Sequence, residues 1–230
     1  MSTGSGAGLD QSRVLAIDGP GGAGKSTVAR ALAARLGLAH LDTGAMYRAV
    51  TWAVLRDGID PADATGAAAL AGRVELDMGE RVLVDGVDVS AGIRGPEVTR
   101  AVSTVSAHPA VRAELVGRQR AWVRDHGGSV VEGRDIGTVV FPGARLKIFL
   151  TASDEVRARR RAADMTVPAG RGGIEGPSVS EVAAELARRD VLDSTRAASP
   201  MSVADDAVVV DTTERGVDDI VESLVVMWEA

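Results

Sequence analysis

Short apolar runs alternate along the chain with longer stretches in which apolar residues recur every three or four positions. Runs of this kind, bounded by glycine, proline or aspartate, are typical of buried strands, and the longer periodic stretches are typical of helices that bury one face. The pattern predicts strands at residues 14–18, 38–41, 129–131, 146–150 and 207–210. It predicts helices at residues 25–36, 45–56, 63–71, 96–106, 109–125, 155–163, 178–196 and 217–228.

Strands that alternate with helices imply an α/β fold, in which helices cover a parallel sheet. Residues 73–89 depart from this alternation, because their short apolar segments and the Asp85-Gly86 turn predict small antiparallel strands. Ligands of parallel sheets bind at the carboxyl ends of the strands. Functional residues are therefore expected directly after the predicted strands.

The composition is typical of one compact globular domain, with 230 residues of which 45% are hydrophobic and 25% charged. The net charge of −6 opposes a nucleic-acid partner, since such proteins usually present a basic domain. The absence of cysteine excludes disulfides, thiol catalysis and cysteine-ligated metals. The three histidines do not have the spacing of metal ligands.

The chain has no apolar run that approaches the length of a membrane span. Residues 1–12 are rich in serine and glycine and lack the basic and apolar regions of a signal peptide. We expect them to form a flexible tail before a single domain at 13–230. We also expect a cytoplasmic protein without a membrane partner, and a monomer, because no heptad pattern is present.

The most specific local motif is a glycine-rich loop between the first predicted strand and the first predicted helix. It matches the pattern G-x-x-x-x-G-K-[ST], whose backbone N–H groups bind nucleoside triphosphates. Lys25 is expected to bridge the outer phosphates, and the Ser26 hydroxyl to bind Mg²⁺. Of the 26 lysines and arginines only Lys25 and Lys147 are lysines, which makes the place of Lys25 informative. The expected ATP-binding residues are Gly19, Pro20, Gly21, Gly22, Ala23, Gly24, Lys25, Ser26 and Thr27.

A phosphate loop does not by itself specify a reaction. A GTPase would carry an Asn-Lys-x-Asp motif that reads guanine, and this chain contains no asparagine. A small-molecule kinase and a nucleotide-binding module without transferase activity both fit the loop. Only the kinase needs a second anion site opposite the loop and mobile cations over the transferred phosphoryl group.

A candidate for that second site follows the predicted strand at 38–41. Thr43 and Tyr47, the only tyrosine, are four residues apart and face the same side of a helix start. Arg48 comes next, and an arginine fork beside two hydroxyl groups can bind a monophosphate. The same residues also fit a capped helix with a packed tyrosine and a solvated arginine.

Several segments, in order along the chain, resemble the bacterial cytidylate kinases, which use ATP to phosphorylate CMP and dCMP. The run Gly-Arg-Asp-Ile-Gly-Thr-Val-Val-Phe-Pro at 133–142 is far more selective than a phosphate loop. The resemblance implies a P-loop kinase fold with a β-containing insert for the nucleoside monophosphate at about 42–112 and a mobile lid at about 153–176. The segments that carry it are residues 19–27, 41–48, 102–112, 132–142 and 187–200.

The resemblance also implies roles for single residues on the acceptor side. Arg48 and Arg134 would bind the CMP phosphate. Thr43 and Tyr47 would lie beside it, and Arg196 would be a further arginine that faces phosphate. Cytosine offers an amino donor and ring acceptors, which suit a carboxylate and an arginine. The implied base-reading residues are Ser103, Arg112 and Asp135, and the residues around the sugar hydroxyls are Arg189 and Asp193.

Two acidic residues at strand ends leave alternatives open. Glu132 stands where Asp is frequent in the family and is expected either to hold Mg²⁺ through water or to pair with Arg134 or Lys25. Asp18, at the end of the first strand, has the same ambiguity. Thr43 stands where relatives often have Ser and keeps the hydroxyl group.

Arginines crowd the predicted helix at 155–163, before a glycine-rich loop at 166–176. Arg157, Arg160 and Arg161 share one helix face, and the family places catalytic lid arginines here. A solvated basic helix is the alternative, whereas the acidic chain and its few aromatic residues oppose a nucleic-acid patch. Lys147 is expected to be an edge or structural residue. The expected catalytic residues are Lys25, Arg134, Arg157, Arg161 and Arg196.

Overall fold

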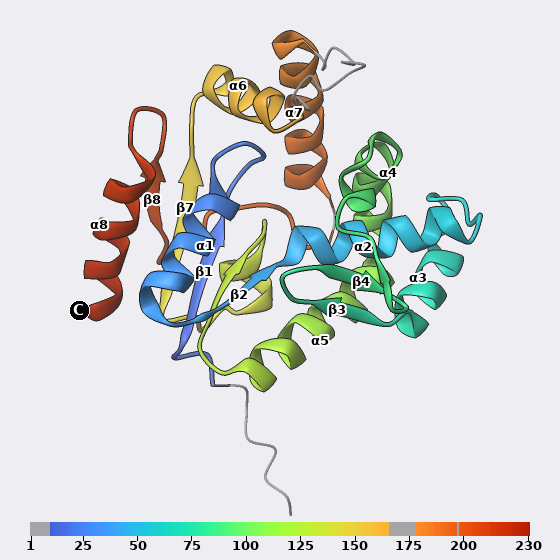
Figure 1. Ribbon diagram of the computed structural model, residues 1–230, viewed down its shortest axis with the longest axis horizontal. Coiled ribbons are helices and arrows are strands. Elements are labelled where there is room, and N and C mark those ends of the chain that lie inside the picture. The colour runs from blue at the N-terminus through green and yellow to red at the C-terminus, as the bar shows by residue number, and fades with distance from the viewer. Residues whose placement is uncertain (1–9, 166–177, 197) are drawn as a thin grey trace, which may run out of the picture.

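The computed structural model describes residues 10–165, 178–196 and 198–230 (Figure 1). A parallel five-stranded sheet forms its centre, with the strands in the order β2-β6-β1-β7-β8. This arrangement confirms the predicted α/β fold. The strands are β1 (Val14–Asp18), β2 (Ala39–Asp42), β6 (Ser129–Glu132), β7 (Leu146–Thr151) and β8 (Val208–Asp211).

Helices cover both faces of this sheet. Successive residues of β1 point to opposite faces, so Leu15 and Ile17 join the apolar cluster under α1 and α8, whereas Val14 and Ala16 join the cluster on the other face. Because both faces are buried, β1 and β6 are short apolar runs without polar alternation. The helices that connect and cover the sheet are α1 (Lys25–Leu36), α2 (Thr43–Arg56), α5 (Pro109–His126) and α8 (Val217–Glu229).

A third apolar cluster lies beside the sheet, where α2 packs against two further helices and a small sheet. The small sheet is antiparallel with the order β3-β4-β5, as the sequence predicts for residues 73–89. Its turn at Asp85 and Gly86 has φ values of 50° and 78°, the conformation that tight hairpins favour. The elements are α3 (Ala64–Arg73), β3 (Leu76–Met78), β4 (Val82–Val84), β5 (Val87–Asp88), η1 (Gly92–Arg94) and α4 (Pro96–Ala107).

The helices α6 (Asp154–Met165) and α7 (Val179–Thr195) pack against each other at the end of the sheet that carries the phosphate loop (Figure 1). Ala158, Val182 and Leu186 are buried between them. The loop predicted at 166–176 and residues 1–9 of the predicted tail lie outside the described residues.

Three details differ from the sequence prediction. The helix predicted from residue 45 begins at Thr43, because the Asp42 side chain accepts a hydrogen bond from the Ala45 N–H at 2.9 Å and so caps it. A short π-helix, η2 (Ile136–Val140), follows β6 where only a family motif marks the sequence. Of the two alternatives for Lys147, the sheet edge is wrong, since β7 lies between β1 and β8. The structural alternative fits, because the side chain is buried and its Nζ pairs with Asp206 at 2.8 Å.

Among the described residues, no helix combines the length and the apolar character that a membrane crossing requires.

Candidate active site

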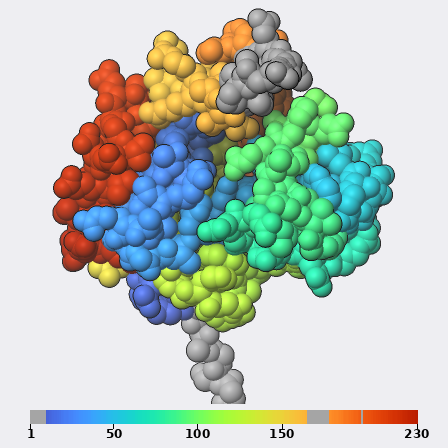
Figure 2. Space-filling view, in the orientation of Figure 1, coloured from blue at the N-terminus to red at the C-terminus, as the bar shows by residue number. Residues whose placement is uncertain are grey.

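An open cleft of about 390 Å³ lies at the carboxyl ends of β1, β2 and β6. It opens between the phosphate-loop and α1 segment and the α4 segment, the blue and green parts of Figure 2. Gly19, Pro20, Ala23, Ser103 and Arg157 are predicted site residues that do not line it. The predicted residues that line it are Gly21, Gly22, Gly24, Lys25, Ser26, Thr27, Thr43, Tyr47, Arg48, Arg112, Glu132, Arg134, Asp135, Arg161, Arg189, Asp193 and Arg196.

The phosphate loop requires its glycines for steric reasons. A Cβ at Gly19 would lie 2.0 Å from the Leu150 carbonyl oxygen, and a Cβ at Gly22 would lie 2.6 Å from the Arg157 carbonyl oxygen. Both residues also have positive φ, as does Gly24, the residue before α1. The loop can therefore wrap closely around the start of α1, where backbone N–H groups bind anions.

Lys25 is held inside this loop. Its Nζ donates a hydrogen bond to the Pro20 carbonyl oxygen at 2.8 Å. Burial, followed by repulsion from Arg134, lowers the pKa of Lys25 to about 7. A phosphate group beside Lys25 would favour its charged form, because an opposite charge offsets the cost of burial.

Glu132 lies beside the phosphate loop and contacts neither Lys25 nor Arg134 as an ion pair. Its Oε2 accepts a hydrogen bond from the Ser26 hydroxyl at 2.7 Å, and its Oε1 lies 3.0 Å from His40 Nε2. The expected pairing with Lys25 or Arg134 is therefore wrong. Ser26 and Glu132 bring together the oxygen donors that Mg²⁺ prefers. Among the residues that the structure describes, no group of three or more His, Asp or Glu side chains could hold a metal alone.

Asp18 has a structural role that the sequence left undecided. Its two carboxylate oxygens accept hydrogen bonds from the backbone N–H groups of Ile136 and Gly137, each at 2.8 Å. These bonds attach the start of η2 to the end of β1 and so hold the preceding Arg134 and Asp135 at the cleft. Burial raises the pKa of Asp18 to about 6, although the two backbone bonds act to lower it.

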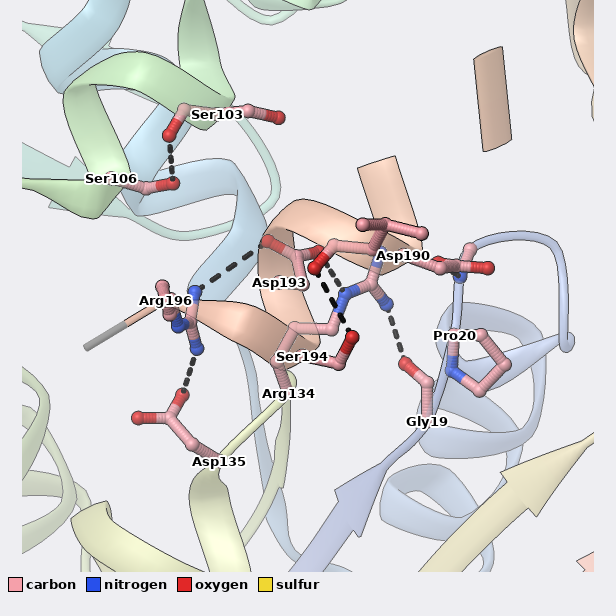
Figure 3. A network of polar contacts seen from close by, with 12 residues as sticks. Gly19, Pro20, Ser103, Ser106, Arg134, Asp135, Asp190, Asp193, Ser194 and Arg196 are labelled. Carbon is pink, nitrogen blue, oxygen red and sulfur yellow. Dashed lines mark hydrogen bonds and ion pairs between the residues drawn. The ribbon is translucent and has the colours of Figure 1, made fainter. Parts of the chain in front are cut away.

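A chain of alternating charges runs from the phosphate loop across the opposite wall of the cleft (Figure 3). Arg134 donates to the Gly19 carbonyl oxygen and, at 2.8 Å, to Asp193. Arg196 lies 3.6 Å from Asp193 and 3.5 Å from Asp135. Although burial acts to raise it, the pKa of Asp193 is lowered by the arginines around it, first by Arg134.

The chain of charges ends at a buried pair between Asp135 and Arg112. The guanidinium of Arg112 also lies over the ring of Tyr47, 5.3 Å from its centre. Buried polar atoms that have no hydrogen-bond partner among the described residues include Arg112 Nε and Arg196 Nη2 at the cleft and the Ser103 hydroxyl behind it. Buried polar atoms are normally paired, so unpaired ones at a cleft indicate a site for a polar ligand. Ser103 itself is set back from the cleft.

Several other arginines line the cleft without an acidic partner among the described residues. Burial and the neighbouring Arg189 and Arg161 lower the pKa of Arg48 to about 9, and burial and Arg134 lower that of Arg189 to about 10. Arg48 donates only to the Ile93 carbonyl oxygen and the Thr99 hydroxyl. Crowded, desolvated cations of this kind are stabilised by an anion.

The arginines of α6 do not act as one face. Arg157 is buried and binds Asp190, Asp154 and the Gly21 carbonyl oxygen, so it braces the phosphate loop. Arg160 donates to Thr212. Arg159 pairs with Glu155 on the surface. Arg161 alone of the four lines the cleft.

Sequence reasoning missed three contributors to the site. Arg94 lines the cleft from η1, His40 contacts Glu132, and Asp190 pairs with Arg157. The sequence could have indicated His40. It lies two residues before Asp42 in a strand that ends at the site, and alternate residues share one face of a strand. The turn that presents Arg94 depends on packing beneath it and left no such signal.

A parallel sheet with a phosphate loop at its carboxyl edge, facing a second cationic wall, defines a P-loop kinase. Residues 15–230 match the family described as cytidylate kinase. A cytidylate kinase of Mycobacterium avium (strain 104) is 57% identical over 206 residues, which are 87% of this chain and 88% of the relative. One of Rhodococcus opacus (strain B4) is 52% identical over 221 residues, 94% of each. The chain belongs to the cytidylate kinase family.

A solved structure of an uncharacterized protein from Eubacterium ventriosum ATCC 27560 has the same general fold, with a TM-score of 0.50 and 12% sequence identity. It covers 94% of this chain and 98% of its own. The likeness concerns the fold alone.

The raised pKa of Asp18 predicts a pH-dependent stability. The native pKa of about 6 exceeds the unfolded value of about 4, so the native state binds more protons between these values. The contribution to the free energy of unfolding is complete below about pH 4 and is lost as the pH rises through 6, by at most about 3 kcal/mol. Urea unfolding from acid to neutral pH should show this decline in the wild type and not in Asp18→Asn. The exposed Asp125→Asn is the matched control, and parallel profiles for the wild type and Asp18→Asn would contradict the assignment.

Proposed function

We propose that this protein transfers the γ-phosphoryl group of ATP to the 5′-phosphate of CMP and dCMP. Membership of the cytidylate kinase family supports this reaction. The observation that carries it is a cleft with the phosphate loop on one wall. On the other wall, beside the Arg112–Asp135 pair, lie arginines that have no acidic partner in the part of the chain that the structure describes. Donor and acceptor phosphates would therefore meet between two cationic walls.

The donor side would bind the triphosphate of ATP through the loop at 19–27. Lys25 would contact the outer phosphates, where its charge is favoured. A second cavity lies behind Gly22, bounded by Arg160, Thr212 and Val217, and offers space for the base of the nucleotide. Arg160 would then lie beside the base of the nucleotide, whereas Arg161 would face the phosphates in the main cleft.

Mg²⁺ is the cofactor that we propose, held by the Ser26 hydroxyl and, through water, by Glu132. Their oxygen atoms, 2.7 Å from each other, fit a hard cation that keeps most of its water ligands. When bound, Mg²⁺ neutralises charge on the phosphates of ATP. Ser26 and Glu132 would orient it relative to Lys25.

The acceptor side would read CMP in three parts. Arg48, Arg134 and Arg196 would bind its phosphate, with Thr43 and Tyr47 beside them. Arg189 and Asp193 would contact the sugar hydroxyls. Asp135 would accept from the cytosine amino group and Arg112 would donate to the ring acceptors, while Ser103 would complete the base pocket. Asp135 and Arg112 already fix each other in this wall.

The reaction needs no strong general base in this site, because the attacking phosphate oxygen is already an anion. Catalysis is then the positioning of two phosphates and the neutralisation of the charge that develops between them. Lys25, Arg134, Arg196 and the lid arginine Arg161, which faces the cleft, would supply that neutralisation. Arg157, the other expected lid arginine, would act by holding the phosphate loop.

We also propose that residues from about 42 to 112 form the insert that binds the monophosphate. We propose that α6 belongs to the lid expected at about 153–176, of which residues 166–176 lie outside the described residues. A cleft of mononucleotide size and a net charge of −6 support small substrates without a nucleic-acid partner. We also propose that the protein is a monomer, because its sequence has no heptad pattern. We place its activity in the cytoplasm.

The reaction is tested by ADP release with Mg-ATP and a panel of acceptors: CMP, dCMP, UMP, AMP, GMP and shikimate. Release should depend on the acceptor and be fastest with CMP or dCMP. Absence of any acceptor dependence would indicate a nucleotide-binding module instead. Release with AMP alone would contradict the proposed base specificity.

Replacement of Lys25 tests the donor side. Lys25→Ala should lower kcat by about 100- to 1,000-fold, because a preorganised cation at the transferred phosphoryl group is lost. Steady-state kinetics with CMP measures the effect. Lys147→Met removes the only other lysine, outside the cleft, and should retain kcat; an equal loss in both variants would refute the assigned role.

Replacement of Asp135 tests the base-reading wall. Asp135→Asn keeps the side-chain volume beside Arg112. It replaces one acceptor oxygen with an NH₂ donor, which would repel the cytosine amino group. The ratio of kcat/KM for CMP to that for UMP should fall by about 10- to 100-fold. An unchanged ratio would show that Asp135 does not read the base.

A further inference from the structure

Glu132 uses its two carboxylate oxygens differently. The side chain is buried, with 3% of its surface exposed. Oε2 accepts from the Ser26 hydroxyl at 2.7 Å, whereas Oε1 lies 3.0 Å from His40 Nε2. Since a carboxylate oxygen accepts, Nε2 is the atom that carries the proton in this contact. One oxygen thus faces the phosphate loop while the other is bound from behind.

The strand β2 brings His40 to this position. β2 pairs with β6 so that Asp42 lies opposite Glu132, and His40, two residues earlier, is on the same face of the strand. Thr43, directly after β2, donates from its hydroxyl to the Glu132 carbonyl oxygen at 2.7 Å. The backbone of Glu132 is therefore fixed, and the carboxylate keeps the freedom of the side-chain torsions, of which the terminal one has only broad preferences.

We propose that His40 is a positioning residue for the metal site. By holding Oε1, His40 keeps Oε2 directed at Ser26, so that the two oxygen donors for Mg²⁺ are oriented before the ion binds. This inference rests on the proposed function, in which Ser26 and Glu132 hold Mg²⁺. Hydrogen-bond partners behind a metal-binding carboxylate commonly contribute about 10- to 100-fold to metal affinity.

A merely structural role for His40 makes a different prediction. Asp42, which is half-buried, neighbours the buried Glu132, and desolvation followed by repulsion from Glu132 raises the pKa of Asp42. If His40 only stabilised this acidic pair, its loss would lower stability and weaken ATP binding with and without metal alike. A positioning role affects the metal-dependent part of ATP binding selectively.

Three variants of the full chain separate these roles. His40→Gln keeps a side-chain N–H at the place of Nε2, because the amide nitrogen of Gln reaches as far as that ring atom. His40→Asn keeps polarity but is too short to reach Oε1, and His40→Leu removes the donor. His126→Leu is the control, since His126 is exposed on α5 and stacks on Trp122.

The measurements are calorimetric ATP binding in EDTA, a Mg²⁺ titration of the enzyme–ATP complex, and thermal melting of each variant. ATP affinity in EDTA should be unchanged in all of them. The Mg²⁺ concentration at half-saturation should rise by about tenfold in His40→Leu and His40→Asn. His40→Gln and His126→Leu should retain the wild-type value.

Equal weakening of ATP binding with and without Mg²⁺, or a His40→Gln variant as impaired as His40→Leu, would overturn the proposal. An unchanged Mg²⁺ requirement in both His40→Asn and His40→Leu would do the same. Acceptor-dependent ADP release by the wild type is measured in parallel. Its absence rejects the proposed function, whereas its presence together with unaffected His40 variants rejects only the role of His40.

Discussion

The parallel pairing of β1 with β6 is the constraint on which the site depends. It sets Ile17 opposite Glu132, so the two chain segments that leave these strands emerge side by side. One becomes the phosphate loop and the other carries Arg134 and Asp135. The hydrogen bonds from the backbone of η2 to Asp18 then tie the second segment to the end of the first strand. Two motifs that lie 115 residues apart along the chain, as Gly19 and Arg134 do, thus form one edge of the cleft.

The second feature that shapes the site is the gathering of positive charge around the cleft. A chain of −6 net charge concentrates arginines around one cleft, where burial makes them costly. Asp193 and Asp135 offset part of this cost through Arg134, Arg196 and Arg112. Arg48 and Arg189 are left without acidic partners among the described residues, and in the proposed function they would attract the substrate anion. The pairs also hold their arginines in place, so little reorganisation is needed when phosphate binds.

The sequence predicted the α/β fold, the phosphate loop and most of the residues that line the cleft. These predictions succeeded because each rests on local chemistry: apolar runs for buried strands, glycines at positions of positive φ, and a lysine at the start of a helix. It failed where partners come from distant segments. The contacts of Glu132 with Ser26 and His40 join three elements of the fold. Arg157, Arg160 and Arg161 point in different directions because each meets a different neighbour of α6, and residue spacing along a helix does not predict those neighbours.

The amino-acid sequence by itself determined the alternation of strands and helices, the triphosphate-binding loop and the family to which the chain is similar, because periodicity and compact motifs are properties of short segments. Only the tertiary structure decided which side chains share the cleft. It made Asp18 a backbone cap, set Ser103 back from the cleft, buried Arg157 against Asp190 and brought His40 behind Glu132. The physical reason is that the environment of a charged group depends on strand order, register and burial, which arise only when distant segments pack together.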